Sequence, residues 1–160
     1  MYFTDRGLEE LAERRGDESV TLEWVAERLR DFIDDTIDPA GVKRVLLCTG
    51  KLYYDLLAAR TERTITDTAI VRMEQLYPLP VDEVRAALGR YPNAVDVAWV
   101  QEEPANQGAW SFIALNLLEH LDGVRLRRIS RPEAAAPSAG STKVHDAEQA
   151  ALIEASLPRP

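Results

Sequence analysis

Short apolar runs alternate with helical segments from Val42 onward, and this alternation limits the fold more than any other feature of the sequence. It is typical of α/β layer folds, in which helices cover a largely parallel sheet. The apolar runs predict strands at Arg44–Cys48, Ala69–Met73, Val95–Val100 and Val124–Ile129. Apolar residues at three- and four-residue spacing predict helices at Leu52–Arg60, Val81–Gly89, Gly108–His120 and Val144–Ala155.

Two of these strands differ in their pattern. Val45 to Cys48 are apolar without interruption, as expected for a strand covered on both faces. Val124 to Arg127 alternate apolar and charged residues, which favours an edge or half-exposed strand. The Ala-, Pro- and Ser-rich stretch Glu133–Ser141 predicts a loop. The expected fold class is therefore α/β, with a small, mostly parallel sheet flanked by helices.

The N-terminal segment has a different character. Residues 1–35 hold 11 acidic and 5 basic residues, so most of the net charge of −8 lies there. Helical spacing predicts a short helix over Asp5–Arg15 and a second that Thr21 caps and that runs to Ile33. The stretch Asp34 to Gly41, with Asp38-Pro39 and Gly41, predicts a connection. We predict an acidic helical appendage and linker over residues 1–41 and an α/β domain over residues 42–160.

Charge and composition exclude several classes of function. An acidic chain is a poor ligand for the phosphate backbone, so nucleic acid is not an expected partner. No apolar run approaches the ~20 residues that span a membrane. The single cysteine, Cys48, cannot form an internal disulfide, which favours a reducing, cytoplasmic location.

No catalytic or metal-binding set emerges from the residues. Cys48 lies in the most apolar strand, where a buried hydrophobe is expected, and the two histidines, His120 and His145, are isolated. Glu102 and Glu103 follow the third strand, but adjacent residues of an extended chain point in different directions. We therefore expect a structural role for both carboxylates.

Two anion sites remain open alternatives. Thr49-Gly50-Lys51 could present free N–H groups at a helix N-terminus, although a tight strand-to-helix turn is the favoured interpretation. Arg125 and Arg127 lie on one face of the fourth strand and form a basic patch with the neighbouring arginines. That patch could hold an anionic metabolite or form solvated surface ion pairs.

Four segments, in one order, resemble the C-terminal domain of thiamine-diphosphate-dependent 2-oxoglutarate dehydrogenase E1, and in detail its actinobacterial multifunctional members. They are CTGKLYYDL from Cys48, AIVRMEQLYPLP from Ala69, WVQEEPANQGAW from Trp99 and SRPEAAAPSAGSTKVH from Ser130. The resemblance implies a transketolase C-terminal-like fold that completes the E1 subunit and its dimer. The expected structural motif residues are Gly50, Lys51, Gln101, Glu102, Glu103, Asn106, Gln107, Gly108 and Trp110.

The resemblance implies family chemistry that this chain does not carry. The family oxidatively decarboxylates 2-oxoglutarate in the tricarboxylic acid cycle with thiamine diphosphate and Mg²⁺, bound by a Gly-Asp-Gly segment and other residues of preceding domains. Gly-Asp-Gly does not occur in this sequence. We therefore expect no catalytic, cofactor-binding or metal-binding residue here, no turnover by the chain alone, and partners that are a second copy or the other E1 domains.

Actinobacterial members also bind acetyl-CoA, in part through a Gln that Gln75 matches and through two arginines that follow. At those arginine positions this chain has Asp82 and Glu83, which would repel CoA phosphates. Gln75, Arg125 and Arg127 are the effector-binding candidates. The alternative function is thus a stand-alone regulatory module for an anionic metabolite or CoA ester.

Residues 1–35 do not resemble E1 and are instead similar to the start of a small, uncharacterised actinobacterial protein. The two resemblances together are compatible with a natural fusion, a truncated gene product or a designed chain.

Overall fold

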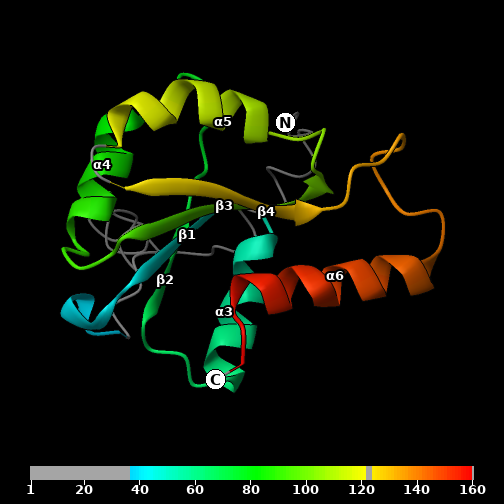
Figure 1. Cartoon of the computed structure of the whole chain (residues 1–160), viewed down its shortest axis with the longest axis horizontal. Helices are drawn as coiled ribbons and strands as arrows, with labels where there is room; N and C mark the ends of the chain where they lie inside the picture. The colour runs from blue at the N-terminus through cyan, green and yellow to red at the C-terminus, as the bar shows by residue number, and fades with distance from the viewer. Residues whose placement is uncertain (1–36, 122–123, 160) are drawn as a thin grey trace, which may run out of the picture. The chain divides into compact units, whose positions relative to one another are not determined.

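The computed structural model describes residues 37–121 and 124–159, which form a four-stranded sheet with helices on both faces (Figure 1). The strands are β1 Arg44–Cys48, β2 Thr68–Arg72, β3 Asp96–Pro104 and β4 Arg125–Arg131. The α-helices are α3 Leu52–Glu62, α4 Val81–Gly89, α5 Trp110–Leu117 and α6 Thr142–Ser156. Two short 3₁₀ helices are η1 Pro39–Gly41 and η2 Leu118–His120.

The sheet is parallel throughout, in the order β2-β1-β3-β4. Arg44 at the start of β1 lies between Thr68 of β2 and Asp96 of β3, so these three strands begin at one level. Asp96 in turn faces Arg125 of β4, and the register of β3 and β4 shifts between Val100 and Pro104. All four strands therefore end on the same side of the domain.

The helices divide the core into two layers, one on each face of the sheet. Side chains alternate along β1, so Val45 and Leu47 join the layer that contains α4 and α5. Leu46 and Cys48 join the layer beneath α3 and α6. All four of these side chains are fully buried, because both faces of the central strand are covered.

Local sequence explains how the helices begin. Gly50 has a φ of +59° and turns the chain from β1 into α3. The Ser141 hydroxyl accepts a hydrogen bond from the backbone N–H of Val144 and so caps α6. Asp82 and Glu83 occupy the first turn of α4, where the helix dipole favours negative charge.

These observations confirm the predicted fold class and the four strands and four helices predicted from residue 42 onward. The bounds of β1 and α4 agree with the prediction, whereas β3 continues four residues beyond the expected end at Val100. The predicted edge strand is β4, which has β3 as its only neighbour in the described sheet. Among the described residues, no helix is long and apolar enough to cross a bilayer.

The two predicted helices of the appendage lie outside the described residues. Of residues 1–41, the structure describes only 37–41, which include η1. The boundary after residue 41 therefore stays a prediction.

Candidate functional site

The sheet has one topological switch point, between β1 and β3. From β1 the chain first moves outward to β2 and then returns to add β3 and β4 on the other side. Open α/β sheets bind ligands beyond the carboxyl ends of the strands at such a point. Thr49 to Lys51 follow the end of β1, and Glu102 to Pro104 are the last three residues of β3.

Lys51 bridges this switch point. Its Nζ lies 2.6 Å from Oε1 of Glu102 and 3.3 Å from Oδ2 of Asp55 in α3. The hydrogen bond to Glu102 raises the pKa of Lys51, with a smaller contribution from Asp55 and an opposing effect of burial. Glu103, by contrast, is exposed, as expected when neighbouring residues of a strand point to opposite faces. The two carboxylates therefore do not form a shared acid/base pair.

Hydrogen bonds extend from Lys51 to the far side of the domain. Asp55 also accepts from the side-chain amide of Gln149 in α6, at 3.2 Å. Gln149 accepts from Arg131 at the end of β4, at 3.0 Å, and Arg131 also contacts Nδ1 of His145 at 3.2 Å. The polar groups at the carboxyl edge thus bind one another and hold α3, α6 and β4 together.

The side-chain amide of Gln101 is the centre of the third family segment. Its Oε1 accepts from the Trp99 indole at 2.9 Å and from the backbone N–H of Trp110 at 3.0 Å. Its Nε2 donates to the backbone carbonyls of Gln107 at 2.7 Å and Pro104 at 3.2 Å. Gln101 is only 4% exposed, so these contacts replace water and fix the loop that leads into α5.

Gly108 packs directly against this amide. Its φ is +69°, and a Cβ at this position would lie 2.9 Å from Nε2 of Gln101 and 2.9 Å from Cβ of Glu103. Only glycine fits both the backbone conformation and the space. Gly50 also has a positive φ, but a Cβ there would enter open space, with nothing within 4 Å.

The third and fourth family segments meet at Ala134. Both Asn106 and Gln107 donate side-chain hydrogen bonds to the Ala134 carbonyl, at 3.1 and 2.9 Å. The Ala134 N–H donates in return to Asn106 Oδ1 at 3.2 Å. Nearby, the Arg128 guanidinium lies 5.8 Å from the centre of the Trp110 ring. Of the predicted structural motif residues, Asn106, Gln107 and Trp110 therefore make their contacts within this domain.

The three effector candidates are not brought together. Gln75 lies beyond the carboxyl end of β2 and donates to the Pro78 carbonyl at 2.9 Å. Arg125 begins β4 at the opposite end of the sheet and is exposed. Arg127 donates two hydrogen bonds to Asp96, at 2.8 and 2.9 Å. Gln75 and the arginines therefore cannot contact one small ligand.

Asp96 is held by two cations. Arg127 and Arg44 both bond its carboxylate, the latter at 2.7 Å. The pKa of Asp96 is lowered, chiefly by the hydrogen bond from Arg127 and then by that from Arg44, against the effect of burial. This cluster fastens β1, β3 and β4 at their amino ends, so Arg127 is already partnered.

Cys48 confirms its predicted place in the core. It is 0% exposed, and burial raises the pKa of its thiol to about 12, so it stays protonated and unreactive at neutral pH. Across residues 37–121 and 124–159, no group of three or more His, Cys, Asp or Glu side chains is placed to hold a metal ion.

Sequence reasoning missed the buried position of Arg131, whose side chain is 6% exposed. It shares the face of Ile129, two residues earlier, and strand alternation could have shown that this face is covered. Its partners in α6 follow a long loop, and no sequence pattern places them.

The profile of the family described as "2-oxoglutarate dehydrogenase C-terminal" matches residues 19–157. The match begins inside the segment that we assigned to the appendage.

Curated relatives match over 77% of this chain. A 2-oxoglutarate dehydrogenase E1 component from Cupriavidus necator is 45% identical over 124 residues, and one from Haemophilus influenzae is 44% identical over 124 residues. A multifunctional 2-oxoglutarate metabolism enzyme from Mycolicibacterium vanbaalenii is 48% identical over 125 residues. The matched region covers 13%, 13% and 10% of these proteins, respectively.

Among solved structures, a protein described as "Split gene transketolase, inactive beta4 tetramer" aligns with a TM-score of 0.51 at 14% identity. In that description, beta4 refers to four subunits. The alignment covers 79% of this chain and 44% of that one, and it shows a shared fold. The profile match, the identities and the fold agree with the four resembling segments, and the chain belongs to the 2-oxoglutarate dehydrogenase C-terminal family.

Proposed function

We propose that this domain serves a 2-oxoglutarate dehydrogenase E1 as its C-terminal structural unit, which completes the subunit and supplies no catalytic group. The proposal rests on the hydrogen bonds made by the third family segment, WVQEEPANQGAW from Trp99. Gln101, Asn106 and Gln107 direct their side-chain hydrogen bonds to backbone groups and tryptophans of this same domain. Such groups stabilise a fold, because their hydrogen-bonding capacity is used within the domain.

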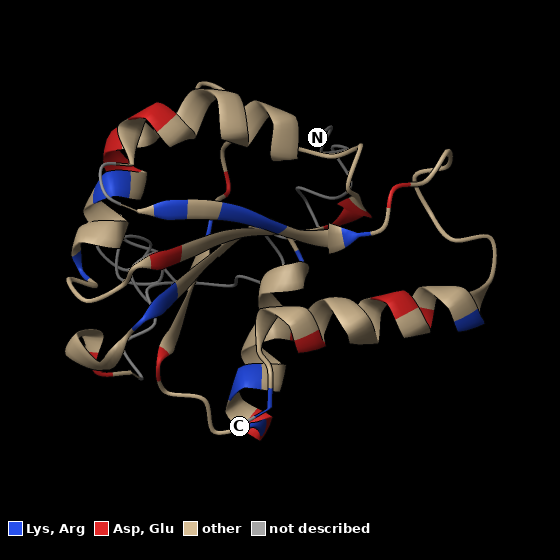
Figure 2. Cartoon of the chain, in the orientation of Figure 1, with Lys and Arg blue, Asp and Glu red and all other residues tan. Residues whose placement is uncertain are grey.

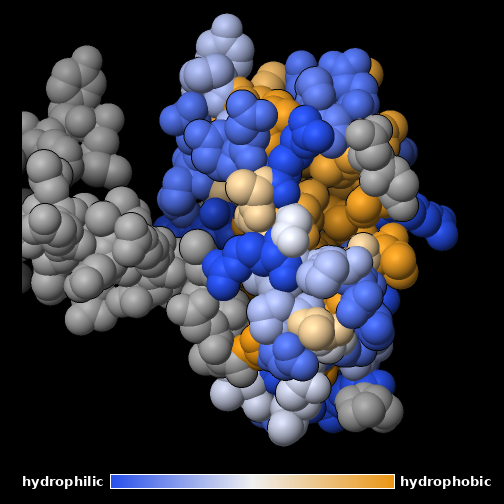
Figure 3. Space-filling model, turned by 90° about the vertical axis from the view of Figure 1, so that its left-hand side faces the viewer, coloured by the Kyte–Doolittle hydropathy of each residue, from blue (hydrophilic) through white to orange (hydrophobic). Residues whose placement is uncertain are grey.

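The surface supports a role in assembly. Large apolar side chains are exposed, including Tyr77 at 85% in the loop between β2 and α4 and Leu115 at 79% in α5. Figure 3 views the side where the strands begin and shows hydrophobic surface between hydrophilic regions. A hollow of about 270 Å³ lies at this end, lined by Leu88, Tyr91, Leu121 and Val124 among others. Exposed apolar patches of this kind mark surfaces that pack against protein.

Thiamine diphosphate and Mg²⁺, the cofactors implied by the family resemblance, would belong to other E1 domains. The described residues do not fit them, since they include no acidic or histidine cluster for a metal and no Gly-Asp-Gly segment. We also infer a cytoplasmic location, where Cys48 would stay reduced.

The proposed partners are the remaining E1 domains and a second copy of the same subunit. The relatives named as E1 components contain this region as a small part of a much longer chain. The related fold belongs to a transketolase described as a tetramer, which is consistent with a domain that takes part in assembly.

Mixing this chain with an E1 relative that lacks the matching C-terminal region tests the proposal. We expect light scattering after gel filtration to show a complex heavier than either component. Gly108→Ala, which disturbs the loop that leads into α5, should weaken the complex, whereas Gly89→Ala, with open space around it, should not. Two components that elute separately at every concentration would refute an assembly role.

A further inference from the structure

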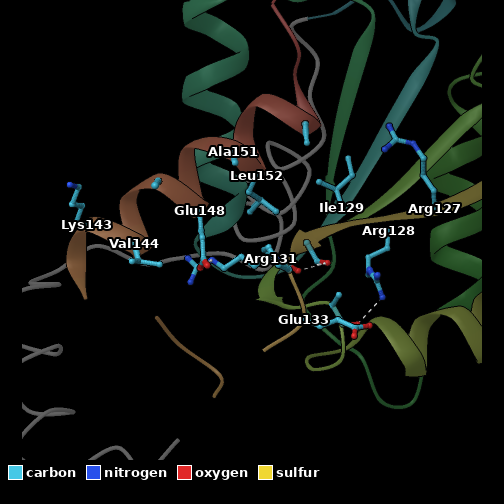
Figure 4. A pocket seen from close by; sticks show the side chains of 15 residues that line it. Arg127, Arg128, Ile129, Arg131, Glu133, Lys143, Val144, Glu148, Ala151 and Leu152 are labelled. Carbon is cyan, nitrogen blue, oxygen red and sulfur yellow. Dashed lines mark hydrogen bonds and ion pairs between the residues drawn. The ribbon is translucent and has the colours of Figure 1, made fainter. Parts of the chain in front are cut away.

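An open groove of about 1110 Å³ runs between β4 and α6 (Figure 4). Arg127 to Arg131 of β4 form one wall, and α6 forms the other with Val144, Glu148 and Leu152. The groove lies along β4, one strand beyond the β1–β3 switch point, and neither the fold comparison nor the family segments assign it a ligand.

The wall made by β4 is a strand edge. In the described sheet β4 pairs with β3 alone, so the backbone on its other side has no strand partner. An unpaired edge of this kind accepts an extended peptide by main-chain hydrogen bonding. The seven residues of β4 are long enough to pair with a short peptide strand.

The groove is cationic on an acidic protein. Arg128, Arg131 and Lys143 line it against two acids, Glu133 and Glu148, and Arg127, which also lines it, is paired with Asp96. Figure 2 shows the basic residues along β4. Since the whole chain carries a net charge of −8, this local excess of positive charge favours an acidic partner.

Arg131 provides the buried cation of the groove. Its side chain is 6% exposed, and its Nε has no hydrogen-bond partner among the residues described. Oε2 of Glu148 lies 3.9 Å away, too far for a hydrogen bond, and Figure 4 shows the two side chains facing each other. Because Nε is buried, Arg131 acts on the groove through its positive charge and not through a direct hydrogen bond to a partner.

The α6 wall supplies an apolar surface beside this cation. Ala147, Ala151 and Ala155 recur every four residues and line the groove, and their small side chains leave room above the buried Leu152. An extended peptide could place alternate apolar side chains there, with acidic residues between them.

Two other occupants fit less well. A small metabolite would leave much of so large and open a groove empty, because ligand pockets of about 300–1,000 Å³ enclose most of their ligand. A second copy that paired through β4 would bring two arginine-rich strands together, and like charges opposite one another destabilise a strand pair.

We propose that the β4–α6 groove binds an extended acidic peptide segment of a partner protein, which pairs with the free edge of β4, packs its apolar side chains against α6 and directs its carboxylates to Arg128 on the other face of the strand. The inference does not depend on the E1 role, because it rests on the groove alone.

Fluorescence polarisation with a dye-labelled, N-acetylated peptide of alternating Val and Glu tests this proposal on the full chain. We expect saturable binding that weakens as salt is added. A Val–Lys peptide of equal length should not bind. Replacing one peptide residue whose backbone N–H faces β4 by Pro should weaken binding, because Pro has no N–H to donate to the strand edge.

Matched variants locate the site. Ala151→Trp fills the groove and should weaken binding at least about tenfold, equivalent to 1.4 kcal/mol. Ala86→Trp, at an exposed position of α4, should not change it. Arg128→Gln should weaken binding about threefold and Arg85→Gln should not, while Glu148→Gln should tighten it by removing a negative charge from the groove.

Three results would overturn the proposal. One is the absence of binding at about 1 mM peptide, which corresponds to barely −4 kcal/mol. Another is equal binding by the Val–Lys peptide or by the Ala151→Trp variant. The third is a dimer that Ala151→Trp dissociates, which would show that a second copy occupies the groove. None of these results depends on assembly with E1 domains.

Discussion

The Gln101 side chain joins parts of the chain that are close in sequence but would diverge without it. It connects the Trp99 indole of β3 to the Gln107 carbonyl of the loop and to the first N–H of α5. Because the amide is buried and both ends are bonded, no residue of similar size can replace it. Gly108 then allows the loop to lie against the amide.

Gln101→Leu should lower the free energy of unfolding by about 3 kcal/mol or more, because it leaves buried carbonyl and indole groups without partners. Urea denaturation measures the change. Glu103→Gln, at the exposed neighbour, should change it by less than about 0.5 kcal/mol. Equal effects of the two substitutions would show that the Gln101 contacts contribute little.

Gly108→Ala and Gly50→Ala should differ although both glycines have positive φ. At Gly50 only the backbone penalty applies, about 1–2 kcal/mol, because the surrounding space is open. At Gly108 the new Cβ also meets Gln101 and Glu103, so the loss of stability should be clearly larger. Thermal unfolding of the two variants decides the point, and equal melting temperatures would contradict this packing.

For single residues, the sequence predicts burial better than it predicts hydrogen-bond partners. Burial of Cys48 and Trp99 follows from the apolar runs, and both are confirmed. The pairing of Asn106 and Gln107 with Ala134 joins residues more than 25 positions apart, which no local pattern encodes.

Among the elements, β4 depends most on charge. It lies at the sheet edge, and Arg127 fastens it to Asp96 of β3. Arg44 binds the same carboxylate from β1, so one aspartate links three strands. The alternating sequence of β4 predicts its position at the sheet edge. The sequence does not predict that Arg44 and Arg127 share Asp96, because this contact depends on the order of the strands.

Asp96 should make stability depend on pH in the acid range. Its pKa is lower in the folded chain than the unfolded value near 3.9, so its stabilisation is complete above that value. The contribution is lost as pH falls through the folded-state pKa. The stability difference between wild type and Asp96→Asn should thus be largest near neutral pH and shrink below about pH 4.

Urea denaturation across this pH range provides the measurement. Asp146→Asn, at an exposed aspartate of α6, provides the control and should show a much smaller difference at every pH. A difference for Asp96→Asn that stays constant from neutral to strongly acid pH would exclude the proposed role of the arginines.

The first turn of α4 argues against tight binding of acetyl-CoA. Asp82 and Glu83 are exposed there and stabilise the helix N-terminus, but they would repel phosphates. Calorimetry should show binding weaker than micromolar, and reversal of both charges to Arg should strengthen it. The same reversal at Glu62 and Asp146 should not, and micromolar binding by the wild type would refute the prediction.

For the whole molecule, the parallel α/β architecture followed from the sequence because buried strands and amphipathic helices leave periodic patterns. The β4–α6 groove did not, because it depends on how the 133–141 loop returns α6 to the sheet. The resulting domain has a complete two-layer core and carries family residues that hold its own loops. The central proposal is that this domain contributes to the assembly of E1 and not to its catalysis.

The most direct test of that claim is 2-oxoglutarate-dependent decarboxylation, measured for this chain alone, for an E1 relative lacking the matching C-terminal region, and for their mixture, with thiamine diphosphate and Mg²⁺ present throughout. We predict no turnover by the chain alone and higher activity in the mixture than in the truncated E1. Turnover by the chain alone, or a mixture no more active than the truncated E1, would contradict the account.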